Sequence, residues 1–223
     1  YYGYWHAISA FCNAGFDLFG QYQSLVRYVT APTIESGNSV SLIWFWALGF
    51  AVMSDCTGKE FRFARLRLHS KMVLVATAAL IVAGTVGFAF LEHGNMGTIG
   101  SLSPAGQFWA SLFQSVSPRT AGFNTVDINS MRSPTMVLTI LLMFIGASPA
   151  STGGGQDHTF ALLLLNIWQV LHGKDECVVY GRRIGDETMF QAFAITSMSL
   201  IWVTAAVLCI TYLEDTSFLY ALF

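Results

Sequence analysis

Two short polar segments carry the residues with the clearest chemical potential. The first, ISAFCNAGFDLF, covers residues 8–19, the second, SVSPRTAGFNT, covers residues 115–125, and both contain Ala-Gly-Phe. A cation that has left water needs several oxygen dipoles, and backbone carbonyls converge on one axis only in conformations that a Cβ resists. Gly15 and Gly122 are the positions that permit such conformations. We therefore predict two ion filters, with a glycine that only allows close helix packing as the alternative for either residue.

The two segments form an internal repeat. A shift of 107 residues places Asn13, Ala14, Gly15 and Phe16 onto Thr120, Ala121, Gly122 and Phe123. Each copy follows a short apolar stretch, residues 4–11 or residues 108–116, that is too short to cross a bilayer and suits a re-entrant helix. A polar linker and a full span follow each copy. The predicted unit is therefore span, re-entrant pore helix, filter loop and span.

The composition indicates an all-α membrane protein. The chain is 54% hydrophobic and 11% charged, and its mean hydropathy is +0.54, whereas a soluble domain carries about 25% charged residues. A net charge of −2 gives no indication of a nucleic-acid partner. The four cysteines are scattered without a CxxC pair, so neither a zinc ribbon nor a disulfide framework is indicated. We expect no resident cofactor in this chain.

Four segments have the apolar character of membrane spans: residues 38–55, 72–91, 134–171 and 188–213. The third would extend about 57 Å as one helix, nearly twice the ~30 Å hydrocarbon core. A break is therefore expected where Pro removes an amide donor and three successive glycines lower helix propensity. The residues of the predicted break are Gly146, Ala147, Ser148, Pro149, Ala150, Ser151, Thr152, Gly153, Gly154 and Gly155. Irregular backbone at membrane depth is tolerated only where protein buries it or where it lines a water-filled cavity, so the break indicates a pathway.

The basic residues predict the orientation. Five of the eleven Lys and Arg residues lie in residues 59–71 and three more in residues 173–187, so both loops are expected in the cytoplasm. Residues 20–37 and 92–132 then lie outside, and both polar segments open from the outer side. The first basic loop is expected to anchor at lipid headgroups, with docking of a cytoplasmic partner as the alternative.

Two residues of the second segment have further expected roles. The restriction on a residue before proline predicts that Ser117 leaves the helical region, which ends the re-entrant helix and begins extended chain. Arg119 lies near the membrane outside the basic loops and needs a carboxylate or carbonyl partner. We expect Arg119, with Asn124, to support the filter rather than face the ions, because a guanidinium on the axis would repel cations.

Four motifs carry a resemblance to a known family: HAISAFCNAGF (6–16), LGFAVMSD (48–55), FQSVSPRTAGFNT (113–125) and LLMFIGASPASTGGG (141–155). With them the sequence resembles the Trk/Ktr/HKT superfamily of potassium transporters, in particular the Ktr-type membrane subunit. That fold has four span, pore-helix, span repeats around one pore, and each repeat gives one filter glycine. The resemblance implies K+ as the transported ion, a multi-pass protein of the plasma membrane, in bacteria the inner membrane, and a homodimer. It also implies a cytoplasmic nucleotide-binding regulatory ring that acts on an intramembrane gating loop, residues 146–158.

The resemblance further implies that the chain is a fragment of an incomplete pseudo-fourfold pore. Its expected parts are residues 1–56 (pore helix, filter and second span of one repeat), 57–71 (basic cytoplasmic loop), 72–172 (a complete repeat with its filter at 117–125), 173–187 (cytoplasmic loop) and 188–223 (first span of the next repeat, truncated). One departure concerns the gate: the family commonly follows the triple glycine with Ile-Lys and several Thr, whereas this chain has Gln156-Asp157-His158-Thr159.

The sequence leaves two alternatives to potassium transport open and disfavours three others. A sodium or mixed monovalent cation transporter of the same fold and a non-conducting membrane scaffold remain alternatives. Residues 153–155 lack the GxxxxGK[ST] pattern of a phosphate-binding loop. The five histidines and Asp157 lack HExxH spacing, which disfavours an intramembrane metalloenzyme. A proton-coupled carrier is disfavoured because the spans contain almost no carboxylates.

Overall fold

The computed structural model describes residues 2–12, 14–16, 18, 52, 54–56, 63, 66–119, 122–147, 157–173, 177–214 and 217–223. Among the predicted site residues, Asn13, Thr120, Ala121 and residues 148–155 lie outside this described part, as does most of the expected span at residues 38–55.

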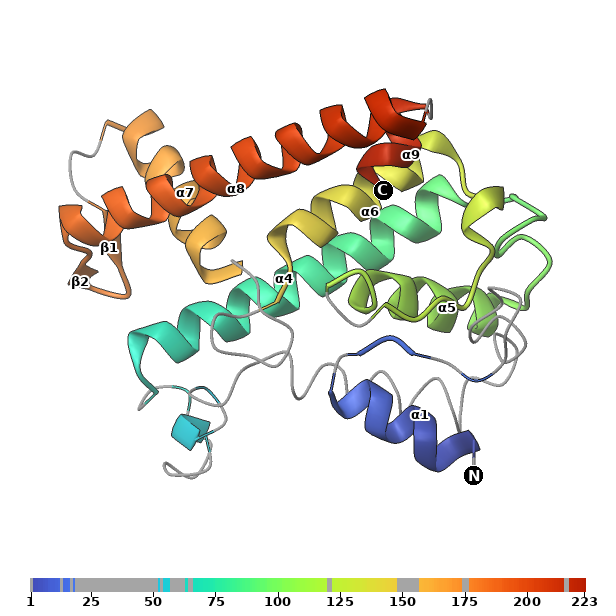
Figure 1. Cartoon of the computed structure of the whole chain (residues 1–223). Helices are drawn as coiled ribbons and strands as arrows, with labels where there is room; N and C mark the ends of the chain where they lie inside the picture. Colours follow the sequence, from blue (N-terminus) through green and yellow to red (C-terminus); the bar gives the residue numbers. More distant parts are fainter. Residues whose placement is uncertain are drawn as a thin grey trace.

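The described part is almost entirely helical, which confirms the predicted class. In chain order its elements are α1 (Tyr2–Phe11), α4 (Leu68–Leu91), α5 (Pro104–Val116), the short 3-10 helix η4 (Ile128–Ser130), α6 (Ser133–Ile145), α7 (Asp157–Leu171), β1 (Val178–Val179), β2 (Arg182–Arg183), α8 (Asp186–Glu214) and α9 (Phe218–Leu222). Figure 1 shows α5 beside α4, with α6 along the other side of α4 and α1 next to α5.

Two helices are long and apolar enough to cross a bilayer. α4 has 24 residues with a mean hydropathy of 2.3, and α8 has 29 residues with a mean hydropathy of 2.1. About 20 helical residues span the hydrocarbon core, so α4 exceeds that length by about one turn and α8 by about two and a half turns. The expected spans at residues 72–91 and 188–213 lie within these helices.

The third apolar segment is divided between two shorter helices. α6 ends at Ile145, where the sequence predicted a break, and α7 begins at Asp157. Gly146, the C-cap of α6, has φ +66°, a backbone conformation that residues with a Cβ rarely adopt.

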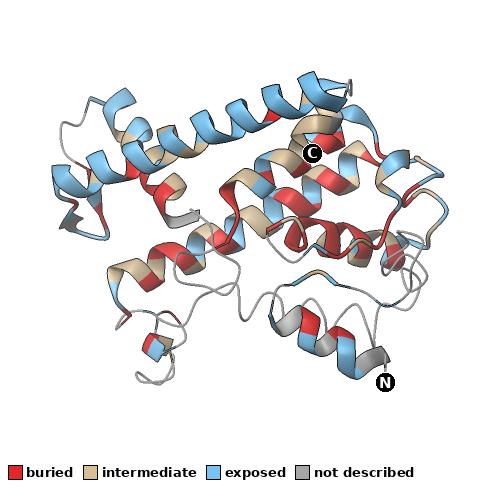
Figure 2. Ribbon diagram, viewed as in Figure 1, coloured by how far each residue is buried: buried red, intermediate tan, exposed pale blue. Residues whose placement is uncertain are grey.

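The core lies where α4, α5 and α6 meet. Figure 2 shows buried residues gathered there, whereas α8 is exposed along nearly its whole length. At Gly84 of α4 a Cβ would lie 2.3 Å from Ser115 Oγ and 3.1 Å from Leu142 Cδ1, so the three helices approach too closely for a larger residue. Ser115 Oγ also donates a hydrogen bond of 2.9 Å to the carbonyl of Ile81. This packing fixes the short helix α5 against the long helix α4.

A small hairpin in the second predicted cytoplasmic loop was not anticipated. Val178 pairs with Arg183 and Val179 with Arg182. The two-residue turn between the strands has φ +50° at Tyr180 and +74° at Gly181, and positive φ at both positions is typical of a type I′ turn.

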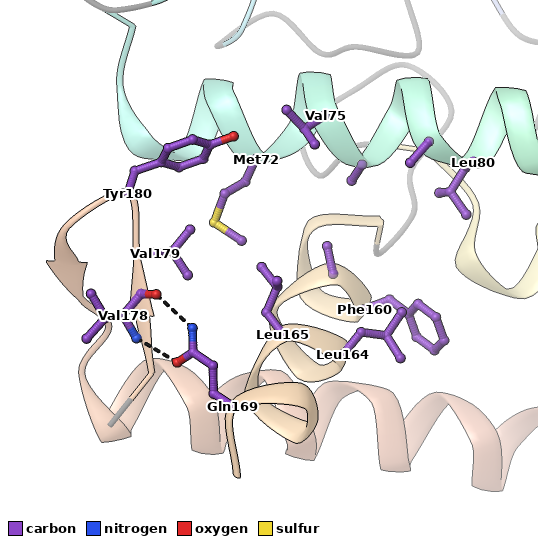
Figure 3. A pocket seen from close by; sticks show the side chains of 13 residues that line it. Met72, Val75, Leu80, Phe160, Leu164, Leu165, Gln169, Val178, Val179 and Tyr180 are labelled. Carbon is purple, nitrogen blue, oxygen red and sulfur yellow. Dashed lines mark hydrogen bonds between the residues drawn. The ribbon is translucent and has the colours of Figure 1, made fainter. Parts of the chain in front are cut away.

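An apolar pocket of about 460 Å³ lies between α4, α7 and this hairpin (Figure 3). Its lining includes Leu164 and Val179, and only Gln169 and Tyr180 among the lining residues carry polar side chains. Gln169 Nε2 donates to the Val178 carbonyl at 2.7 Å, and the Val178 amide donates to Gln169 Oε1 at 2.9 Å. This lining offers no set of converging oxygens for a cation, so the candidate ion site lies elsewhere.

Candidate functional site

The second polar segment leaves the end of α5 as a loop held by Ser117. The Ser117 carbonyl accepts a hydrogen bond from the Gly122 amide at 3.3 Å, and the Ser117 hydroxyl donates to the Phe123 carbonyl. Gly122 has φ +77°, a left-handed backbone conformation that a residue with a Cβ resists.

The short helix ends at Val116, just before Pro118, as expected, but the prediction that extended chain begins at Ser117 is wrong. Its φ of −60° and ψ of −42° lie in the right-handed helical region, and its amide donates to the Phe113 carbonyl at 2.9 Å as the C-cap of α5. Proline at position 118 disfavours this conformation. The two hydrogen bonds that Ser117 makes to the filter loop offset that local preference.

The first polar segment is held in the same way by Ser9, in the last turn of α1. The Ser9 carbonyl accepts from the Ala14 amide at 2.9 Å, and Ser9 Oγ donates to the Phe16 carbonyl at 2.8 Å. Gly15 has φ +68°. The two loops thus share a left-handed glycine and a serine whose hydroxyl donates to the carbonyl of the phenylalanine after that glycine.

The two glycines lie against each other. A Cβ built on Gly122 would be 3.3 Å from the Cα of Gly15. The ring centroids of His6, in α1, and Phe123 are 6.4 Å apart. Segments separated by 107 residues in the sequence therefore meet at the two predicted filter positions.

A cavity of about 290 Å³ opens beside Gly122. Its lining includes the polar residues Gln114, Ser117, Asn124 and Thr139. Gln114 Nε2 also donates to Thr125 Oγ1 at 3.3 Å, behind the loop. Four of its ten lining residues have polar side chains, against two of thirteen in the apolar pocket, so this cavity suits water or a hydrated ion better than that pocket does.

Arg119 connects the predicted filter loop to the end of α6. The residue is 3% exposed. Its Nε donates to the Gly146 carbonyl at 2.9 Å, and its Nη2 donates to Thr77 Oγ1 of α4 at 3.4 Å. A cation beside the last carbonyl of α6 also interacts favourably with the negative end of that helix dipole. The guanidinium is directed at α4 and α6. A carboxylate or a carbonyl partner was expected for Arg119, and the Gly146 carbonyl is such a partner.

Only the two ends of the predicted gating loop, residues 146–158, are described. Gly146 and Ala147 are both buried, and the Gly146 carbonyl accepts from Arg119. Asp157 and His158, at the other end, are the first two residues of α7.

Glu92 joins the end of α4 to the start of α6 and to the loop that follows α4. The residue has 0% of its surface exposed at the end of α4. One carboxylate oxygen accepts from the Arg132 amide at 2.9 Å and from the Thr135 hydroxyl, at the start of α6. The other accepts from Asn95 Nδ2 at 2.6 Å and Thr98 Oγ1 at 2.8 Å. Burial by itself raises the pKa of Glu92. The four hydrogen bonds together lower the pKa by more than burial raises it, so the pKa lies below its ordinary value.

Metal ligation has no support in the described part of the chain. No group of three or more His, Cys, Asp or Glu residues there could hold a metal ion.

Comparisons with known proteins agree with the fold. The family model for TrkH, described as a cation transport protein, matches residues 1–223. The chain is 40% identical over 222 residues to Ktr system potassium uptake protein B of Vibrio alginolyticus, covering 98% of this chain and 48% of that protein. It is 41% identical over 221 residues to the protein of the same name from Bacillus subtilis, again covering 98% and 48%.

A third relative, potassium/sodium uptake protein NtpJ of Enterococcus hirae, is 34% identical over 209 residues, covering 92% of this chain and 45% of that protein. The crystal structure of the potassium transporter TrkH from Vibrio parahaemolyticus superimposes with a TM-score of 0.71 at 19% identity, covering 93% of this chain and 44% of that one. The chain spans about half the length of these relatives. The resemblance stated from the motifs is thus confirmed, and the metalloenzyme alternative is set aside because the relatives are ion transporters. The chain is part of a multi-pass membrane protein and belongs to the TrkH family of cation transport proteins.

Proposed function

We propose that the protein takes up K+ across the plasma membrane through a filter to which Gly15 and Gly122 contribute backbone carbonyls. The observation that carries this proposal is the meeting of two left-handed glycines, 107 residues apart, at the ends of two short helices. Carbonyl dipoles at such a place replace part of the ion's hydration shell, and conduction needs only moderate binding. The membrane potential supplies ~2.3 kcal/mol per charge per 100 mV for uptake.

The relatives support potassium as the ion. Two of them are potassium uptake proteins by name. Sodium or mixed transport is the second candidate, because a relative with 34% identity is named a potassium/sodium uptake protein. In this proposal the ion is cargo, and the chain holds no resident cofactor.

The proposal includes a loop below the filter that limits flux, formed by residues 146–158, and partners that act on it. We propose that the protein forms a homodimer and that a nucleotide-binding ring docks on its cytoplasmic face. The exposed side chain of Arg67 on that face supports such docking, whereas Lys71 Nζ already lies 5.7 Å from the ring centroids of both Phe63 and Tyr180.

Gly122→Ser in the full-length protein is expected to lower the ratio of potassium to sodium uptake roughly tenfold. A Cβ at φ +77° costs about 1–2 kcal/mol, and one decade corresponds to about 1.4 kcal/mol. The added atoms would also press on the Gly15 backbone, 3.3 Å away. The measurement is uptake of each ion by cells that lack other potassium transporters.

Gly94→Ser is the matched control, because Gly94 has φ +74° but nothing within 4 Å of its Cβ position. It carries the same conformational cost without touching a filter loop. A normal uptake ratio in Gly122→Ser would count against the filter.

Deletion of residues 151–155 is expected to raise potassium flux several-fold, because a shorter loop would block the pathway less. Ser151→Ala, which keeps the loop length, is the control and should leave flux near the unmutated rate. Flux that stays flat after the deletion would remove this loop as the barrier.

A further inference from the structure

One serine holds each filter loop at two points. Ser9 accepts from the Ala14 amide and donates to the Phe16 carbonyl, and Ser117 accepts from the Gly122 amide and donates to the Phe123 carbonyl. We call each serine with these two hydrogen bonds a serine clamp. In both loops the hydroxyl reaches the carbonyl of the phenylalanine that follows the glycine.

The equivalence of the two clamps is not visible in the sequence repeat. The shift that superimposes the glycines places Ser117 opposite Ala10 and Ser9 opposite Val116. Ser9 lies six residues before its glycine, whereas Ser117 lies five residues before its own. Each hydroxyl nevertheless donates to the carbonyl of the phenylalanine that follows its glycine. The shared feature is therefore the contact itself, and the loops reach it with different numbers of residues.

The contact determines which carbonyls can face an ion. A phenylalanine carbonyl that accepts from a serine hydroxyl is directed at the end of the short helix. The oxygens left for the ion are then those of the glycine and of the residues before it. Without the hydroxyl, the peptide plane after the glycine can rotate, which changes the number and direction of the oxygen dipoles that set selectivity.

Burial makes the hydroxyls difficult to replace. Ser9 is 6% exposed and Ser117 is 2% exposed, so water has little access to a carbonyl that loses its donor. Phe123 is buried, whereas Phe16 is exposed. The clamp at Ser117 therefore has the larger expected effect.

We infer that Ser9 and Ser117 are positioning residues of the filter, each of which fixes the phenylalanine carbonyl after its glycine and thereby sets potassium selectivity. The inference rests on the proposed filter function. It adds two side chains outside the Ala-Gly-Phe motif to the determinants of selectivity.

The test uses the full-length protein with Ser117→Ala, Ser9→Ala and the double variant. The readout is the ratio of potassium to sodium uptake, normalised to the amount of protein in the membrane. Loss of one net hydrogen bond corresponds to about a two- to tenfold change. We expect the ratio to fall by that factor in each single variant, more in Ser117→Ala, and to be restored largely by Ser9→Thr and Ser117→Thr, which keep the hydroxyl.

Ser115→Ala is the matched control. Ser115 is in the same helix with 0% of its surface exposed, and its hydroxyl donates to the Ile81 carbonyl of α4 instead of a filter loop. Its loss should leave the uptake ratio unchanged even where the amount of protein falls. An equal change of ratio in Ser115→Ala and Ser117→Ala would overturn the inference in favour of general packing of α5.

The remaining outcomes separate the inference from the proposed function. If Gly122→Ser lowers the ratio and the serine variants do not, the clamps are overturned and the filter stands. If neither Gly122→Ser nor the serine variants change the uptake ratio, the filter proposal fails, and the inference about the serine clamps fails with it. Should Ser117→Ala not reach the membrane, Ser9→Ala, in the more exposed loop, carries the test, and an unchanged ratio there overturns the inference.

Discussion

Full-length protein with Arg119→Met is expected to lose most of its potassium uptake and to unfold at a lower temperature. Methionine fills a similar volume without hydrogen-bond donors, so the Gly146 carbonyl and the Thr77 hydroxyl lose their guanidinium partner in a buried site. Hydrogen bonds to charged groups contribute about 1.5–3 kcal/mol each, so a loss on the order of 3 kcal/mol is expected. Uptake and thermal unfolding of the purified protein measure the two effects.

Uptake should fall because Arg119 connects two parts of the proposed pathway. It lies three residues before Gly122, and its partner Gly146 begins the proposed gating loop. Without this contact, the filter loop and the end of α6 are free to shift independently. Arg119→Lys should recover part of the unfolding temperature, since an ammonium can donate to the carbonyl but cannot reproduce the planar fork of donors.

Arg132→Met is the control for Arg119. Arg132 is exposed, and its Nη1 also donates to a carbonyl at a helix end, that of Leu91 at 2.9 Å. An exposed contact of this kind is worth little, about 0–1 kcal/mol. Arg119→Met protein that unfolds and transports like the Arg132→Met protein would show that the buried contact has no special role.

Glu92→Gln is the second substitution with a large expected effect, a loss of about 3 kcal/mol of stability. The carboxylate accepts four hydrogen bonds, two from the start of α6 and two from the loop that follows α4. A glutamine side chain has one oxygen and one NH2 group, so two of the four donors would face another donor. Charge-assisted hydrogen bonds are also about twice as strong as neutral ones. Thermal unfolding of purified full-length protein at pH 7 measures the loss.

The effect should depend on pH in a defined direction. Because the folded state lowers the pKa of Glu92, its ionised form contributes stability that is present above the ordinary carboxyl pKa of about 4.3. That contribution is lost as the pH falls through the lower folded pKa. The difference in unfolding temperature between the unmutated protein and Glu92→Gln should therefore be constant from pH 7 to about pH 5 and shrink below about pH 4.

Glu187→Gln provides the comparison for both measurements. Glu187 is exposed in the first turn of α8, and such surface changes usually stay within about 0.5 kcal/mol. A difference between unmutated and Glu92→Gln protein that persisted unchanged at pH 3 would contradict the titration of this carboxylate.

Local chemistry explains what the sequence could predict of the fold. The apolar lengths of α4 and α8 predict spans, because an uninterrupted apolar helix of about 20 residues is stable in the hydrocarbon core of a bilayer. Their ends extend beyond the apolar stretch, since a helix such as α4 continues through polar residues like His69 and Lys71. The end of α6 at Ile145 also follows from local chemistry, the glycine and proline residues just after it.

Hydrogen bonds to distant residues account for what the sequence could not predict of the site. Arg119 and Gly146 are 27 residues apart, and Glu92 and Thr135 are 43 apart, so no local pattern indicates either contact. The need of Arg119 for a partner was predictable, but the identity of that partner was not. At Ser117 two contacts to the filter loop outweigh the local effect of the following proline.

The hairpin at β1 and β2 could have been found from the sequence. Tyr180-Gly181 is a two-residue connection between Val-Val and Arg-Arg, and glycine in such a position is typical of a tight hairpin turn.

The apolar length of α8 has a consequence for how the protein is made. Its 29 residues have a mean hydropathy of 2.1, so this helix is long and apolar enough to cross a bilayer by itself. Its backbone satisfies its own hydrogen bonds, and its apolar side chains need no protein partner in lipid. α8 can thus leave the translocon for the bilayer as an autonomous unit and associate with α7 afterwards, in a second stage of biogenesis. Inherited changes that place a charge midway along α8 would then act during synthesis, before any pore exists to be tested.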